Sequence, residues 1–221
     1  MSTRPALEEP VVPAPPAGVL VLGIGNVLWA DEGFGVRALE ALHQRWHVPS
    51  NVALVDGGTQ GLYLLEHVCS AERVLVFDAI DYKLAAGTLR VFRDDEVPVW
   101  SDQMMSLHQA TFQELLSLAH LRGRFPQRIT LIGVQPDVLD DLGGSLSPRV
   151  RARLAEAVAL AVSELSAWGI AMLPRSAPPE EPLSPAALAI HLYEGERPPE
   201  TEACRIGDAR FLNQMHREGN G

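Results

Sequence analysis

Short hydrophobic runs alternate along this chain with longer segments in which hydrophobic residues recur every three or four positions. The runs typical of buried strands are 19–25, 51–58, 73–80 and 128–136. Helical spacing is found in 35–46, 61–71, 108–121 and 147–169. The last of these helices is expected to start at Ser147 and Pro148, because proline is favoured in the first helical turn. Strands that alternate with helices predict a doubly wound α/β sheet with helices on both faces.

One strand-like segment breaks this alternation. Residues 87–95 alternate between apolar and polar positions, and the connection from the preceding strand is too short for a crossover helix. We therefore expect an edge strand that runs antiparallel to its neighbour.

The two ends of the chain differ from the middle in composition. Residues 1–18 are acidic and rich in proline, and they lack the apolar segment of a signal peptide. Residues 174–221 begin with a linker-like Pro/Ser/Glu stretch and continue too polar to form a core. We expect one α/β domain over 19–173, between a disordered leader (1–18) and a tail (174–221) that is dispensable for folding.

Composition narrows the class of protein. Apolar residues make up 47% of the 221 residues, and the formal net charge of -10 argues against nucleic acid or an anionic membrane as partner. No apolar run reaches the roughly 18 residues of a membrane span. The two cysteines, Cys69 and Cys204, do not form a disulfide framework. We expect a cytoplasmic protein.

Three candidate metal ligands follow strands at the carboxyl edge of the predicted sheet, where open α/β sheets bind ligands. Glu32 lies in the turn after the first strand, Asp78 ends the run 73–80, and His108 opens the helix after the edge strand. Two carboxylates and an imidazole suit a divalent transition metal with positions left open. The alternative is that Asp78 caps a turn, Glu32 lies at a helix N-terminus and His108 is a surface cap.

Other motifs are weaker. Gly23 and Gly25 resemble the start of a dinucleotide-binding loop, with Asp56 as the ribose ligand, but Leu28 replaces the third glycine. His43 and His47 are four apart on a predicted helix face, as in a zinc protease, but Gln44 replaces the general-base glutamate. The remaining acids and histidines near the edge are expected to be surface or cap residues: Asp31, Asp81, His67 and His120.

Several motifs in order resemble one family. They are VLGIGNVLWADEGFGVR, VDGGTQGLYLLEHV, VFDAIDY followed by GTLR, MSLHQ, and LIGVQP followed by LDDLGGSLS. Together they are similar to the NiFe-hydrogenase maturation endopeptidases, which trim the C-terminal extension from the hydrogenase large subunit. The resemblance covers about residues 19–173, and it is nearest to the subfamily that serves membrane-bound uptake hydrogenases.

The resemblance implies a fold and a metal. The fold is a three-layer α/β/α arrangement around a twisted, mostly parallel sheet, here of five strands. The metal is nickel, recognised by Glu32, Asp78 and His108 and supplied by the substrate protein, although other divalent metals could occupy the same ligands. The implied partner is the large-subunit precursor, and the free protease is expected to be a monomer.

The resemblance also implies roles for residues near the predicted metal ligands. Residues of the DGGT loop are expected to bind substrate: Gly57, Gly58 and Thr59. Trp29 either contacts the substrate protein or packs beneath its loop. No catalytic nucleophile is identified, and Asp56 and Asp81 are weak candidates for a general base. Two rival functions stay open: a non-catalytic chaperone that senses nickel in the large subunit, and a nucleotide-binding enzyme.

Overall fold

The computed structural model describes residues 18–97, 107–184, 188, 190 and 193, and it describes 107–111 by their backbone alone. The predicted leader, apart from residue 18, and most of the predicted tail lie outside these residues. The strands are β1 (Val19–Ile24), β2 (Trp46–His47), β3 (Val52–Gly58), β4 (Arg73–Ala79), β5 (Leu89–Arg93), β6 (Arg128–Val134) and β7 (Leu173–Pro174). The α-helices are α1 (Phe34–Arg45), α2 (Leu65–Ser70), α3 (Leu107–Leu121), α4 (Pro148–Arg151) and α5 (Leu154–Ala167).

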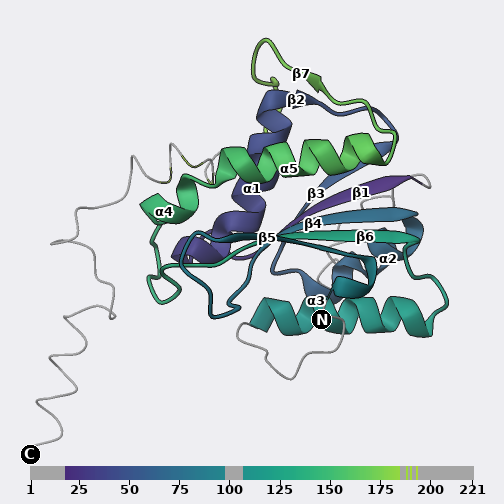
Figure 1. Ribbon diagram of the computed structural model, residues 1–221, viewed down its shortest axis with the longest axis horizontal. Coiled ribbons are helices and arrows are strands. Elements are labelled where there is room, and N and C mark those ends of the chain that lie inside the picture. Colours follow the sequence, from purple (N-terminus) through teal and green to yellow (C-terminus); the bar gives the residue numbers. More distant parts are fainter. Residues whose placement is uncertain (1–17, 98–106, 185–187, 189, 191–192, 194–221) are drawn as a thin grey trace, which may run out of the picture.

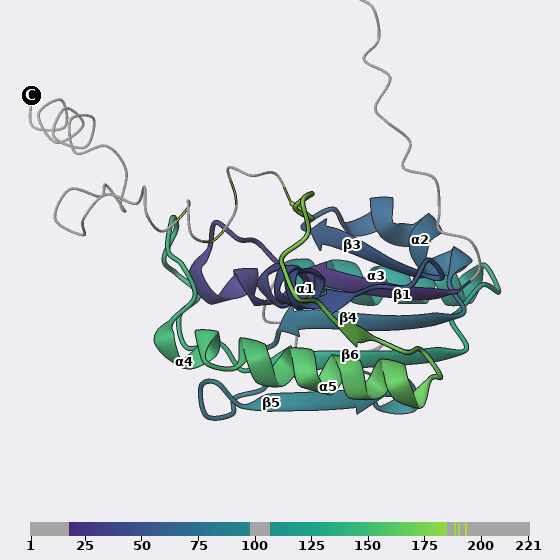
Figure 2. The same cartoon turned by 90° about the horizontal axis from the view of Figure 1, so that it is seen from above.

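Five strands form the central sheet, in the order β3-β1-β4-β6-β5. β1 pairs in parallel with β3 and β4, and β4 pairs in parallel with β6. β5 is antiparallel to β6, so the prediction of an antiparallel edge strand is confirmed. Figure 2 shows β3 and β5 at opposite edges of the sheet. The chain leaves β1 and β4 toward opposite sides, which places the switch point of the sheet between their carboxyl ends.

Helices cover both faces of the sheet, which confirms the three-layer arrangement (Figure 1). α1 and α5 pack on one face, around Phe34, Leu39 and Leu165. α2 and α3 pack on the other, around Val68, Leu115 and Leu116. Among the helices of the described residues, none combines the length and apolar character that crossing a bilayer requires.

The first turn of α1 lies unusually close to the sheet. A Cβ atom on Gly35 would overlap the carbonyl oxygens of Ile24 and Phe77. Since Ile24 ends β1 and Phe77 lies in β4, two residues before its end at Ala79, glycine at position 35 lets the helix start close to the switch point. The loop between β1 and α1 is thereby held at the carboxyl edge of the sheet.

Two predicted helices differ from those observed. The segment 147–169 is divided into α4 and α5 by a break at residues 152–153, although its predicted start is confirmed: Ser147 is the N-cap and accepts a hydrogen bond from the Val150 N–H. The segment 61–71 begins as a 3-10 helix (Gly61–Leu64) before α2.

The first helix ends one residue earlier than predicted. Trp46 is extended, with φ -130°, and pairs through β2 with β7. His47 therefore lies on a strand, and the reading of His43 and His47 as two residues on one helix face is wrong. The end of the helix is set by a residue distant in sequence. Arg175 donates from Nε to the carbonyls of His43 and Trp46, which lie at the end of α1 and directly after it.

The described part of the predicted tail lies along α1. The Glu181 carbonyl is 3.1 Å from His43 Nε2, Leu183 packs against the core, and Ser184 is buried. These residues contact the domain, while the domain bounds given above stay a prediction.

Candidate functional site

The loop after β1 turns back sharply at Gly25. This residue has φ 130°, a conformation that favours glycine, and a Cβ atom there would overlap the Glu32 carbonyl oxygen. Its N–H also donates to the Gly58 carbonyl at 2.9 Å, which joins the loops that follow β1 and β3. The Gly25 turn thus lets residue 32 lie directly over the end of β1.

Glu32 lies in a 3-10 helix (Ala30–Gly33) in this loop and is half-buried. Burial raises the pKa of its carboxyl above the usual range. Its N–H donates to the Trp29 carbonyl at 2.9 Å, so its backbone is fixed within the loop.

Asp78 ends β4 opposite Gly133 of β6 and is 3% exposed. Burial raises the pKa of its carboxyl well above the usual range; a hydrogen bond with the Ala79 backbone acts in the opposite direction, and the nearby Glu32 charge raises the pKa further. Among the described residues, its Oδ1 has no hydrogen-bond partner. An unpaired oxygen on a buried carboxylate is costly unless a ligand compensates it.

The chemistry of Glu32 and Asp78 fits a divalent cation. Both are carboxylates, the Glu32 charge acts on Asp78, and a bound cation would favour the ionised form of both. The third predicted ligand, His108, lies in the first turn of α3, and its side chain lies outside what the structure describes. Among the side chains that are described, no three His, Cys, Asp or Glu residues gather into a metal site.

The two candidate general bases have structural contacts. Asp56 at the end of β3 accepts from the Gly58 N–H at 3.0 Å and from Ser184 Oγ at 2.9 Å. Asp81 accepts from Gln135 Nε2 at 2.9 Å and from the Lys83 N–H. The bond from Gln135 lowers the pKa of Asp81, which makes it a weaker proton acceptor. No contact singles out either as a base, and both stay predictions.

A groove of about 420 Å³ opens between the loops after β1 and β3. Its lining residues from these loops include Gly25, Asn26, Leu28, Asp56, Gly58 and Thr59. Leu183 and Leu188 of the C-terminal segment close one side of it.

The predicted substrate-binding residues are placed differently around this groove. Gly58 and Thr59 line it. Gly57 is buried, and a Cβ atom there would be 3.0 Å from Leu64 Cδ1. Trp29 is half-buried, and its backbone forms a β-bridge with Leu142 in the loop between β6 and α4.

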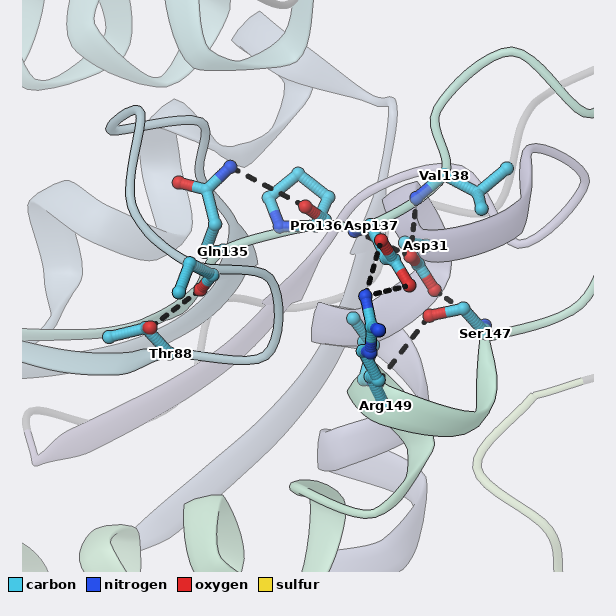
Figure 3. Close-up of polar contacts among 10 residues, drawn as sticks. Asp31, Thr88, Gln135, Pro136, Asp137, Val138, Ser147 and Arg149 are labelled. Atoms are coloured by element: carbon cyan, nitrogen blue, oxygen red, sulfur yellow. Dashed lines mark hydrogen bonds and ion pairs between the residues drawn. The ribbon is translucent and has the colours of Figure 1, made fainter.

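Asp31 was expected at the surface or as a cap, and this expectation is wrong. It is fully buried and accepts hydrogen bonds from the backbone N–H groups of Asp137, Val138 and Ser147 (Figure 3). All three donors lie in or directly after the loop between β6 and α4. Because they are backbone groups, no residue type in the sequence indicates them.

Comparison with known proteins agrees with this architecture. The model of the hydrogenase maturation protease family matches residues 36–164, more than half of the chain. The hydrogenase expression/formation protein HupM of Azotobacter chroococcum mcd 1 is 53% identical over 201 residues, which cover 90% of this chain and 96% of that protein. The hydrogenase 2 maturation protease of Escherichia coli (strain K12) is 39% identical over 160 residues, 72% of this chain and 97% of that protein.

The solved structures give the same result. The hydrogenase maturating endopeptidase HybD from E. coli matches with a TM-score of 0.69 at 39% identity, covering 72% of this chain and 98% of that chain. The alignments cover nearly the whole length of both sequence relatives and of the solved HybD structure. This chain belongs to the hydrogenase maturation protease family.

Proposed function

We propose that this chain is a nickel-dependent endopeptidase that removes the C-terminal extension of a NiFe-hydrogenase large-subunit precursor after nickel insertion. The observation that carries the proposal is the pair Glu32 and Asp78 at the switch point, with one buried Asp78 oxygen unpaired among the described residues. Membership of the maturation protease family supports the class of reaction.

The residues of the chain have separable roles in this proposal. Asp78, fixed at the end of a central strand, and Glu32, on the loop after β1, hold the cation together with His108 of α3. Nickel held there supplies Lewis acidity toward the scissile peptide bond. The nickel comes with the precursor, so the protease cleaves only a precursor that has received its metal.

The groove between the loops after β1 and β3 accommodates the chain to be cut. Its backbone at Gly58 allows an extended peptide to approach closely, because this residue carries no side chain and only the Asp56 carboxylate lies within 4 Å of its Cβ position. Leu28 and Leu183 give it apolar walls, and Asn26 and Thr59 give it hydrogen-bonding groups. An apolar groove with a few polar groups is typical of sites that bind one segment of a ligand.

The test uses purified protease and nickel-loaded precursor, with the mass of the large subunit as the readout. The wild type is expected to shorten the precursor, and Glu32→Gln and His108→Ala are expected to leave it at full length. Glu66→Gln is the matched control, since Glu66 is an exposed carboxylate paired with Arg122 and Arg124 on the surface. Precursor that stays uncut by the wild type until another protease is added would show a nickel-sensing chaperone instead.

A further inference from the structure

We infer that Asp31 is a positioning residue: it holds Glu32 at the metal site by fixing the loop after β1 to the loop between β6 and α4. This inference rests on the function proposed above and assigns different roles to the two neighbouring acids. Glu32 is half-exposed and acts electrostatically on Asp78, whereas Asp31 is fully buried and makes its hydrogen bonds inside the protein.

The Asp31 carboxylate closes the second loop at both ends. Oδ2 accepts from the N–H groups of Asp137, at 2.9 Å, and Val138, at 2.8 Å. Oδ1 accepts from the Ser147 N–H at 2.6 Å. Asp137 and Val138 lie near the start of this loop (135–147), and Ser147 ends it as the N-cap of α4. Three of the carboxylate's roughly four acceptor positions are thus filled by backbone donors of this loop.

Backbone contacts continue the attachment between the two loops. The Asp31 N–H donates to the Val138 carbonyl at 3.1 Å, the Gly143 N–H donates to the Leu28 carbonyl at 2.7 Å, and Trp29 bridges Leu142. The loop after β1 is therefore bonded to this neighbouring loop at Leu28, Trp29 and Asp31. The Asp31 side chain bonds to that neighbouring loop both near its start, at Asp137 and Val138, and at its end, at Ser147.

Ala30 shows why the loop needs such a constraint. It is 2% exposed and has φ 39°, in the left-handed region that a residue with a Cβ atom disfavours. Such a conformation persists only where the surrounding structure holds it in place. Asp31 follows Ala30 directly, so its three hydrogen bonds fix the strained turn, and Glu32 is the next residue along the chain.

The consequence concerns the metal more than the binding of the protein substrate. If the Asp31 bonds are removed, Ala30 can relax and Glu32 moves relative to Asp78, which stays fixed on β4. Residues that orient metal ligands typically change metal affinity or activity by about 10- to 100-fold when they are replaced. One wall of the groove, with Gly58 and Thr59, lies on a different loop. The other wall includes Leu28, whose carbonyl keeps its bond from the Gly143 N–H when Asp31 is replaced, so KM for the precursor is expected to change less than kcat.

The first test replaces Asp31 by asparagine, which keeps the shape but turns one acceptor oxygen into an N–H₂ donor. Ni²⁺ is titrated into the metal-free protein, and paramagnetic broadening of the Ala79 amide signal reports its arrival at Asp78. D31N is expected to need about 10-fold more Ni²⁺ than the wild type for half-broadening, with a similar fall in kcat. Glu164→Gln is the control, because Glu164 is also buried and bonded, to Arg93 and Thr130, but lies on α5; it is expected to lower Tm without changing the titration.

The second test cuts the same attachment from the other side. Ser147 has φ -57°, which proline adopts, and Ser147→Pro removes the N–H that Asp31 accepts from. Ser147→Ala keeps that N–H and removes only the hydroxyl, so the two variants isolate the bond. We expect S147P to shift the Ni²⁺ titration as D31N does, and S147A to titrate as the wild type does.

The outcomes separate this inference from the proposed function. A wild-type titration profile for both D31N and S147P overturns the positioning role, whether or not the protease cleaves. Should D31N not fold, the comparison between S147P and S147A decides alone. Broadening of Ala79 by Ni²⁺ in a wild type that does not cut precursor would contradict the proposed function and leave the role of Asp31 supported by the titration.

Discussion

The acidic residues at the carboxyl edge of the sheet differ in how their charges are compensated. Asp31 is bonded to three backbone N–H groups, and Asp81 is bonded to Gln135 and the Lys83 backbone. Asp78 is buried with one oxygen that has no partner among the described residues. A protein keeps such a carboxylate at a measurable loss of stability when the group serves a ligand.

We predict that Asp78→Asn abolishes processing of the precursor and makes the protein more stable. The neutral amide has nearly the same shape, and burying it costs less than burying a charge. The variant is expected to leave precursor uncut and, in metal-free buffer at pH 7, to gain about 1 kcal/mol or more in the free energy of unfolding, as is typical when a buried charge is replaced by a neutral group. Urea unfolding measures the gain. A variant less stable than the wild type would indicate that Asp78 is a structural residue.

The ionised carboxylate of Asp81, in contrast to that of Asp78, is expected to stabilise the fold. Its pKa is lowered in the folded state, first by the hydrogen bond from Gln135, so the ionised form stabilises the fold above the unfolded pKa of about 3.9. This contribution is lost as pH falls through the folded pKa. Asp81→Asn is therefore expected to lower Tm slightly at pH 7, by the equivalent of less than about 1 kcal/mol because the group is exposed. Thermal scans from pH 7 to pH 2 should show the difference closing; a constant difference would mean that charge is not its origin.

The helix α1 connects the packing of the domain with the geometry of the site. Its first turn lies against the carbonyls of Ile24, at the end of β1, and Phe77, within β4, and the loop that carries Glu32 leads directly into it. A displacement of α1 would therefore move Glu32, on the loop after β1, relative to Asp78 on β4.

We accordingly predict that Gly35→Ala impairs both stability and processing. The added Cβ overlaps two backbone oxygens, which cannot rotate away as a side chain would. The free energy of unfolding is expected to fall by about 3 kcal/mol or more, at the upper end of the effect of overpacking, and the processing rate is expected to fall with it. Gly169→Ala is a control, because nothing lies within 4 Å of a Cβ atom there, although its φ of 81° adds some strain. Wild-type processing by Gly35→Ala would show that α1 can shift without moving Glu32.

Across the whole molecule, local patterns predict the sheet but not the contacts that join distant loops. The apolar runs of β1, β4 and β6 are buried on both faces and are readable from sequence, and their carboxyl ends place Glu32 and Asp78 at the same edge. The role of Asp31 cannot be predicted from the sequence, because the Asp137 N–H that donates to it is a backbone group 106 residues further along the chain. The pairing of β2 with β7 could not be predicted from sequence either, because it joins two segments that lie far apart in the chain.

The last prediction concerns how the molecule recognises a precursor that is ready to be cut. The proposed ligands are two carboxylates and one imidazole, without a thiolate, and they leave the coordination of nickel incomplete. A site of this kind is expected to bind nickel weakly in the free protease and to bind it well only when the precursor supplies further ligands. Tight permanent binding would also defeat the selection, since the protease could then cut a precursor without metal.

Two measurements test this together: calorimetric titration of the metal-free protease with Ni²⁺, and cleavage of nickel-free and nickel-loaded precursor by the same preparation. We expect a dissociation constant in the range of roughly 10 μM or weaker, equivalent to a binding free energy of about −7 kcal/mol or less in magnitude, and cleavage of the loaded precursor alone. Zn²⁺ added to the protease with nickel-free precursor is the control for a metal that the ligands accept but the precursor does not carry. Stoichiometric tight nickel in the protease, with equal cleavage of both precursors, would make this an ordinary metalloprotease that carries its own metal, and the substrate would then be selected by the groove rather than by its nickel.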